Sequence, residues 1–203
     1  MNNTCYKIIK GTCYAIFKVL FRTSYYGVEN IPKEGAIVIA SNHISLLDPP
    51  VVGAACTRKL HWMAKEELFV PVLGTIYKWL GAFPVKRGTA DRTAITHGIN
   101  ILKNKEVLAI FPEGTRSKTG ALGKAAPGAL MMAGRVKATI LPTCVIGTDV
   151  KRQGKLWPKV KVKFGKPITF PKDELVGKDL LNRLSNEMMA SIAELQAGEQ
   201  KCK

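Results

Sequence analysis

Short apolar runs that suit buried strands alternate along this chain with longer stretches that carry a helical pattern. The strand candidates are residues 36–40, 60–64, 83–85, 107–111, 139–146 and 160–164, and helical patterns lie near residues 50–57, 72–80, 91–104, 126–134 and 178–197. Alternation of this kind is typical of an α/β domain. We therefore predict a largely parallel mixed sheet with helices on both faces.

Lysine alternates strictly with apolar residues over positions 159–164, which indicates a strand with one solvated basic face and one buried face. Edge strands and antiparallel strands have this character. The chain has 203 residues, of which 46% are hydrophobic, so it can bury a sizeable core, and no linker-like tract or repeat divides it. We expect residues 26–203 to form one domain behind an amphipathic segment of residues 1–25.

That amino-terminal segment contains no acidic residue and has the pattern of an amphipathic helix. Its cations recur at helical spacing, with Tyr14 completing the stripe, and apolar side chains lie opposite them. The cations are Lys7, Lys10, Lys18 and Arg22. The apolar residues are Ile8, Ile9, Ala15, Ile16, Val19 and Leu20. The pattern favours a helix that lies in the interface of an anionic membrane, and the alternative is a helix that packs its apolar side on the domain. Lys18 interrupts the apolar run, so we do not expect a membrane-spanning helix, and no A-x-A cleavage site follows, which disfavours a signal peptide.

Charge and cysteine content limit the partners and the compartment. The formal net charge of +16 favours anionic partners, namely nucleic acid, an acidic membrane surface or phosphorylated substrates. The five cysteines are scattered and form no CxxC pair, which fits a reducing compartment better than a disulfide framework. We expect a cytosolic setting rather than a secreted one.

Asn42–Asp48 places a histidine and a carboxylate five residues apart, on the loop expected between the strand at 36–40 and the next helix. Loops at the carboxyl edge of a sheet commonly carry chemistry. His43 could take a proton from a hydroxyl group while Asp48 orients its ring. Because Asp48 directly precedes Pro49, it could also cap the following helix, and His43 could be an ordinary loop residue.

Two further segments combine glycine with cations at the end of a strand. Phe111–Ser117 (FPEGTRS) brings Glu113, Gly114 and Arg116 into one turn, which in outline is an anion-handling loop. Its alternative is a turn stabilised by a local pair of glutamate and arginine. The segment from Gly81 to Gly88 also ends a strand with two cations, and its alternative is a solvated loop.

Together these blocks resemble the glycerolipid acyltransferase family, which includes the lysophosphatidate acyltransferases. NHxxxxD stands at Asn42–Asp48, GxFxxxR at Gly81–Arg87, FPEGTRS at Phe111–Ser117, and a hydrophobic strand enters Pro142. The resemblance spans most of residues 30–165. The first and third blocks are specific in combination, and the other two support them.

The resemblance implies that a fatty acyl group passes from acyl-CoA or acyl carrier protein to the sn-2 hydroxyl of 1-acyl-sn-glycerol 3-phosphate, giving phosphatidate for phospholipid synthesis. His43 would be the general base, oriented by Asp48, with no covalent acyl-enzyme, no metal and no cofactor besides the acyl donor. The implied substrate-binding residues are Glu113, Gly114, Thr115, Arg116, Arg87, Lys65, Gly81 and Phe83. A sister reaction on glycerol 3-phosphate or another lysophospholipid stays open. The expected location is the cytoplasmic face of the cell membrane, as a peripheral protein.

Other classes of function explain less of the sequence. A basic nucleic-acid-binding module would explain the charge, but zinc-finger, RNP and helix-turn-helix signatures are not apparent. A serine hydrolase would need a GxSxG motif, which is absent, and His43, His61 and His97 are too dispersed to indicate a metal site.

The apolar region from Leu68 to Val85 is either core, an exposed patch or an acyl-chain groove.

Overall fold

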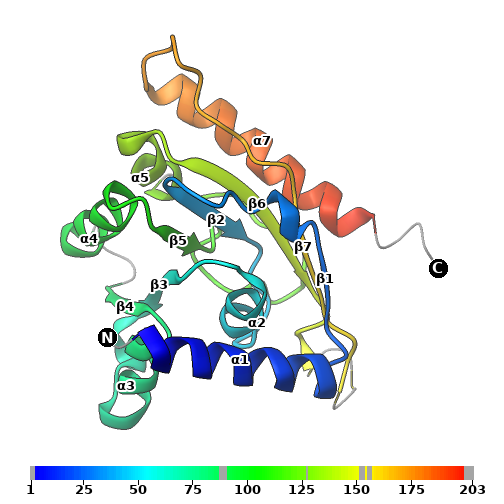
Figure 1. The fold of residues 1–203 in the computed structure, drawn as a ribbon. Coiled ribbons are helices and arrows are strands. Elements are labelled where there is room, and N and C mark those ends of the chain that lie inside the picture. The colour runs from blue at the N-terminus through cyan, green and yellow to red at the C-terminus, as the bar shows by residue number, and fades with distance from the viewer. Residues whose placement is uncertain (1–2, 87–90, 127, 151–153, 155–156, 199–203) are drawn as a thin grey trace.

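A single seven-stranded sheet runs through the protein, in the order β1-β7-β6-β2-β5-β3-β4 (Figure 1). The computed structural model describes all residues except 1–2, 87–90, 127, 151–153, 155–156 and 199–203. The strands are β1 (Ser24–Tyr26), β2 (Ile37–Ser41), β3 (Leu60–Lys65), β4 (Ala82–Val85), β5 (Val107–Ile110), β6 (Thr139–Ile146) and β7 (Lys161–Phe164). Every neighbouring pair is parallel except β6 and β7, which confirms the predicted mixed, largely parallel sheet.

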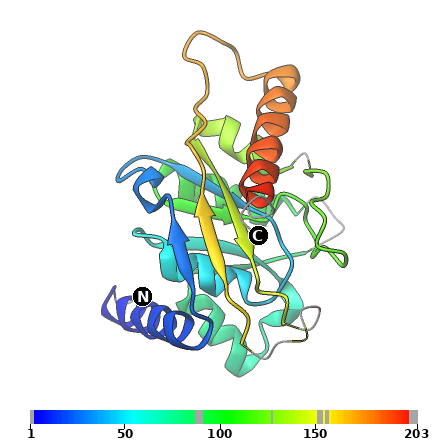
Figure 2. The same ribbon diagram turned by 90° about the vertical axis from the view of Figure 1, so that its right-hand side faces the viewer.

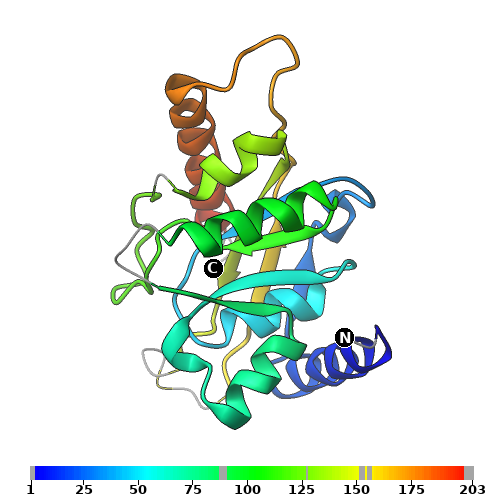
Figure 3. The same ribbon diagram turned by 90° about the vertical axis from the view of Figure 1, so that its left-hand side faces the viewer.

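Helices cover both faces of the sheet, as the alternation predicted. They are α1 (Asn3–Leu20), α2 (Asp48–Ala55), α3 (Pro71–Trp79), α4 (Arg92–Lys103), α5 (Gly128–Val136) and α7 (Lys178–Ala197), with short 3-10 turns at Val28–Asn30 and Glu66–Leu68. One core cluster joins α1 and α2 to the sheet, and a second joins α4, α5 and α7 to its other face (Figures 1 and 3).

The two cores explain why the central strands read as continuous apolar runs. In β2, Ile37 and Ile39 belong to the core under α1 and α2, whereas Val38 and Ala40 belong to the core under α4, α5 and α7. Successive side chains of a strand point to opposite faces, and a parallel sheet covered on both sides needs apolar residues on both. In β7 half-buried lysines alternate with buried apolar residues, and the strand is antiparallel to β6, which is one of the two predicted alternatives. The other alternative, an edge strand, is wrong, because β1 pairs in parallel with the outer side of β7.

Helix α1 has one apolar side packed on the domain and another exposed to solvent. Tyr6 and Phe17 are buried, and the Tyr6 hydroxyl accepts a hydrogen bond from the backbone amide of Leu60 at 3.2 Å. Ile8 and Val19 are 63% and 74% exposed. Among the described helices, none is long and apolar enough to cross a membrane.

The sheet includes one strand that the sequence patterns do not predict. β1 contributes three residues at the edge beside β7 and crosses the boundary predicted between the amphipathic segment of residues 1–25 and the domain (Figure 2). Three residues are too few to show a strand periodicity. The amino-terminal stretch is thus tied to the sheet immediately after α1 ends.

The carboxyl ends of four parallel strands converge at one edge of the sheet. β2 lies between β5 and β6, and β3 lies on the far side of β5. The loops that follow these strands therefore meet: Asn42–Leu47 after β2, the FPEGTRS loop after β5, Lys65 at the end of β3 and Thr148 just beyond β6. A ligand site is expected at such an edge.

Candidate active site

His43 and Asp48 form a buried, hydrogen-bonded pair. His43 Nδ1 lies 2.8 Å from Asp48 Oδ2, and the two residues are 5% and 0% exposed. The same oxygen accepts hydrogen bonds from the backbone amides of Ile44 at 2.7 Å and Ser45 at 2.8 Å. Three donors thus converge on one carboxylate oxygen, which fixes the direction of the imidazole ring.

The alternative in which Asp48 caps the following helix is wrong. α2 begins at Asp48 itself, its N-cap position is Leu47, and no side-chain capping bond is made there. The carboxylate instead reaches back to the amides of the preceding loop. Proline in the first turn of α2 starts this helix.

Thr148 occupies the second oxygen of Asp48. Its Oγ1 donates to Asp48 Oδ1 at 2.5 Å, and the residue is fully buried. The sequence reasoning did not find Thr148, because the contact joins positions 100 residues apart. The one available signal was its place just after a strand that ends at the same edge of the sheet as β2.

Asn42 attaches the loop that carries His43 to the neighbouring strand β6. Its Nδ2 donates to the carbonyl oxygen of Val145 at 2.9 Å, and the Val145 amide donates to Asn42 Oδ1 at 2.7 Å. This two-bond contact continues the pairing of β2 with β6 by one side chain. The residue before the histidine is therefore held against β6 by two hydrogen bonds.

The FPEGTRS loop holds the backbone of His43 on both sides. Glu113 Oε1 accepts from the His43 amide at 3.1 Å, and the Ser117 amide donates to the His43 carbonyl oxygen at 2.8 Å. The second oxygen of Glu113 accepts from the amide of Gly123 at 2.8 Å. The Phe111 ring stacks on the imidazole, with centroids 3.8 Å apart and planes 13° apart.

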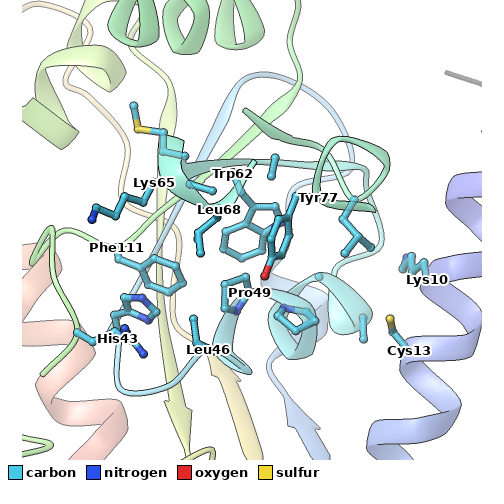
Figure 4. A pocket seen from close by; sticks show the side chains of 18 of the residues that line it. Lys10, Cys13, His43, Leu46, Pro49, Trp62, Lys65, Leu68, Tyr77 and Phe111 are labelled. Carbon is cyan, nitrogen blue, oxygen red and sulfur yellow. The ribbon is translucent and has the colours of Figure 1, made fainter. Parts of the chain in front are cut away.

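A cavity of about 310 Å³ opens beside His43 and extends toward α1 (Figure 4). His43, Phe111 and Lys65 lie at one end of the labelled lining in that view, and Lys10 and Cys13 lie at the other. The wall between them is apolar and aromatic, formed by side chains that include Leu46, Pro49, Trp62, Leu68 and Tyr77. The apolar region from Leu68 to Val85 contributes part of this wall, because Leu68, Tyr77 and Leu80 line the cavity.

Two of the predicted anion-binding cations reach this cavity. Arg116 is exposed and lines it, and Lys65 lines it while pairing with Glu67 at 2.8 Å. Gly114 and Thr115 lie exposed in the same loop as Arg116. Arg87 lies outside the described residues.

Gly81 and Phe83 lie apart from the cavity lining. Gly81 adopts φ +85°, and a Cβ there would come 2.2 Å from the carbonyl oxygen of Leu60, so only glycine suits this turn. Phe83 is buried in the core, with its ring 4.6 Å from that of His97. Their positions give each a structural role in the GxFxxxR block.

The two remaining histidines lie away from this site. His61 Nε2 is 3.2 Å from Glu106 Oε2, and burial lowers the pKa of His61 more than that carboxylate raises it. Within the described part of the chain, no three His, Cys, Asp or Glu side chains gather closely enough to hold a metal ion.

The sequence of this chain is similar to those of known proteins. A family model described as Acyltransferase matches residues 22–146. The 1-acyl-sn-glycerol-3-phosphate acyltransferase of Bacillus subtilis is 30% identical over 165 residues, which are 80% of this chain and 82% of that protein. A chloroplastic protein of the same name from Brassica napus is 29% identical, over 83% of this chain and 51% of that longer protein.

A solved structure shares the fold as well. The crystal structure of the 1-acyl-sn-glycerophosphate acyltransferase of Thermotoga maritima has a TM-score of 0.76 at 28% identity, over 95% of this chain and 80% of that one. The family match covers more than half of the chain and includes the buried histidine and aspartate. The chain therefore belongs to the acyltransferase family, with His43 and Asp48 as its HxxxxD pair.

Proposed function

We propose that this enzyme transfers a fatty acyl group from a thioester, acyl-CoA or acyl carrier protein, to the sn-2 hydroxyl of 1-acyl-sn-glycerol 3-phosphate, giving phosphatidate. The observation that carries the proposal is the His43–Asp48 pair at the end of an apolar cavity that Arg116 also lines. A lipid acceptor with a phosphate head matches the two features of this cavity, because its acyl chain suits the apolar wall and its phosphate suits the cations. The names of the relatives support the same reaction.

His43 supplies the acid and base chemistry. Its Nδ1 bonds to Asp48, so Nε2 is the nitrogen that receives the proton when the acceptor hydroxyl attacks the thioester carbonyl carbon. The new carbon–oxygen bond forms, the carbon–sulfur bond breaks, and the imidazolium returns the proton to the departing thiolate. Buried Asp48 stabilises the imidazolium during the step.

The cations beside the pair suit the phosphate of the acceptor. Arg116 can hold two phosphate oxygens at once, and Lys65, which also lines the cavity, adds a point charge. Arg87 completes the set of cations in the motif. The apolar wall from Leu46 to Tyr77 then accommodates an acyl chain.

We also propose that the enzyme works as a peripheral protein on the cytoplasmic face of an anionic membrane. Exposed Lys7 and Lys18 on one side of α1, and exposed Ile8, Ile16 and Val19 on another, give this helix the surface of an interfacial helix. Because Tyr6, Lys10 and Cys13 of the same helix line the cavity, a lipid can pass from the membrane to His43 without crossing bulk water.

The test is a panel of acceptors and donors assayed with the purified enzyme. We expect phosphatidate from lysophosphatidate with acyl-CoA or acyl carrier protein, and little product from glycerol 3-phosphate or lysophosphatidylcholine. Faster turnover of either of those acceptors would replace the proposed substrate by a sister reaction of the family. The absence of transfer to any acceptor would refute the proposal.

A further inference from the structure

Helix α3 carries an exposed apolar stripe. Val72, Ile76 and Trp79 are 73%, 41% and 49% exposed, and their spacing of four and three residues places them on one side of the helix. The other side is occupied, since Gly74 contacts the backbone of Phe69 and Tyr77 lines the cavity. The stripe therefore does not belong to the core.

The surroundings of this stripe favour a membrane as its occupant. α3 and α1 lie at the same end of the molecule in three views, and residues from both line the cavity (Figures 1, 2 and 3). Exposed Lys78 on α3 and exposed Lys7 and Lys18 on α1 complement anionic head groups. Tryptophan beside aliphatic side chains is typical of helices at a membrane interface.

We propose that α3 inserts its Val72–Ile76–Trp79 stripe into the interface of an anionic membrane beside α1. The cavity then opens between two membrane-bound helices, and a lipid substrate enters it directly from the bilayer. The entry of a lipid substrate from the bilayer rests on the proposed function, whereas the binding of α3 to the membrane does not.

The test is sedimentation of the full chain with vesicles of phosphatidylcholine and phosphatidylglycerol. Val72→Asp combined with Ile76→Asp should weaken binding about tenfold or more, because two charged groups replace apolar contacts. The matched control is Leu175→Asp combined with Val176→Asp, which adds the same two charges at residues that are 92% and 36% exposed. These residues belong to the loop before α7, which lies at the opposite end of the molecule (Figure 1). Lipids with brominated chains should quench Trp79, so that Trp79→Phe removes part of the quenching.

Unchanged sedimentation of the double variant would overturn the proposal. So would a double variant that binds vesicles normally but changes its elution volume in gel filtration, because the stripe would then contact a second copy. Activity on a short-chain acceptor that is monomeric in solution does not depend on membrane binding, so it tests the proposed reaction separately from the binding of α3 to vesicles. On that acceptor the double variant should match the unaltered enzyme, and failure of the unaltered enzyme would count against the reaction and not against vesicle binding.

A second observation independently concerns the reaction. Asp48 is fully buried, three donors hold its Oδ2, and Thr148 Oγ1 donates to its Oδ1. A carboxylate held at both oxygens cannot rotate about its Cβ–Cγ bond. We infer that Thr148 is a positioning residue that acts through Asp48 on His43.

Steady-state kinetics of Thr148→Val tests this inference. We expect kcat to fall about tenfold or more with the acceptor KM nearly unchanged, and Thr148→Ser to restore most of kcat. The control is Thr143→Val, the same change at a fully buried threonine of β6 whose hydroxyl bonds only to the Leu141 carbonyl oxygen among the described contacts.

The pH–rate profile distinguishes positioning from a general loss of stability. Without the hydrogen bond from Thr148, more of the Asp48 charge acts on the imidazolium of His43. The acidic limb of the plot of kcat against pH should therefore move toward higher pH. The other charged groups around His43 are Glu113, Arg116 and Lys65, which the substitution leaves in place. An unmoved limb, or equal effects of Thr148→Val and Thr143→Val, would refute the inference.

Discussion

Glu113 and Arg116 lie three residues apart in one loop, yet the structure gives them different partners. Both oxygens of Glu113 accept from backbone amides, one of them the amide of His43, whereas the exposed guanidinium of Arg116 lines the cavity. A carboxylate in this position does not attract a phosphate, but it holds the backbone of His43. We therefore propose that, within the FPEGTRS loop, Glu113 positions the proposed base and Arg116 binds the anion.

Arg116→Ala should mainly raise the KM for the phosphorylated acceptor, by about 10- to 100-fold, because a charge-assisted contact to phosphate is lost. Little change in kcat is expected. Lys118→Ala, which removes a cation two residues away that does not line the cavity, is the control. If only the KM of the acyl donor rose, the head-group role of Arg116 would be wrong.

Glu113→Gln should act on kcat instead. The substitution replaces one carboxylate oxygen, a hydrogen-bond acceptor, by an amide NH2 group that faces a backbone N–H. One of the two hydrogen bonds to the loops therefore breaks, and His43 is less well positioned. We expect kcat to fall by about tenfold or more, with a smaller change in acceptor KM. A rise in acceptor KM alone would show that Glu113 contacts the substrate.

At the scale of elements, the sequence predicts the central helices and strands well, because their periodicity is set by burial on both faces of the sheet. It does not predict β1, which has three residues, nor which apolar side of α1 packs on the domain. It also leaves open whether the stretch around α3 is core or exposed. The structure divides that stretch, with Tyr77 in the cavity wall and Val72 in solvent.

The junction between α1 and β1 offers a test of stability. The Tyr25 ring stacks on Tyr14 with centroids 5.5 Å apart, but its buried hydroxyl has no hydrogen-bond partner among the described residues. Burial, with smaller contributions from Tyr14 and Cys13, raises the pKa of Tyr25 to about 12. The neutral phenol is therefore favoured by the folded state.

Tyr25→Phe should keep the stacking and remove the unpaired hydroxyl, so we expect unchanged or higher stability at neutral pH, by up to about 1 kcal/mol. A raised pKa means that the stability contributed by neutral Tyr25 is present below pH 10 and is lost as pH rises toward 12. Denaturant unfolding at both ends of this range should show a smaller alkaline loss in the variant. An equal loss in both proteins would contradict the assignment.

At the scale of the whole molecule, the order of strands brings the motifs together. The blocks near residues 43, 65 and 113 follow strands that are parallel neighbours, so a largely parallel sheet already predicts that they meet. Hydrogen bonds across 70 or 100 residues, such as those of Glu113 and Thr148, depend on three-dimensional geometry and could not be predicted from spacing.

The net charge of +16 also acts at this scale, through the surface that α1 presents. Ile8→Asp combined with Val19→Asp should reduce binding to anionic vesicles, and added salt should weaken the binding of the unaltered protein. These exposed positions are preferred to deletion of α1, because deletion would uncover the buried side chains of Tyr6 and Phe17. Binding that is insensitive to both changes would contradict an interfacial α1.

Acyl transfer by the His43→Ala variant shows whether His43 is the general base. The unaltered enzyme and the variant should be compared with lysophosphatidate and a labelled acyl thioester, after circular dichroism and thermal unfolding have shown that the variant is folded. We expect kcat of the variant to fall by about 10²-fold or more, because general base catalysis is lost. A folded variant that retains most of the activity would show that His43 is not the base.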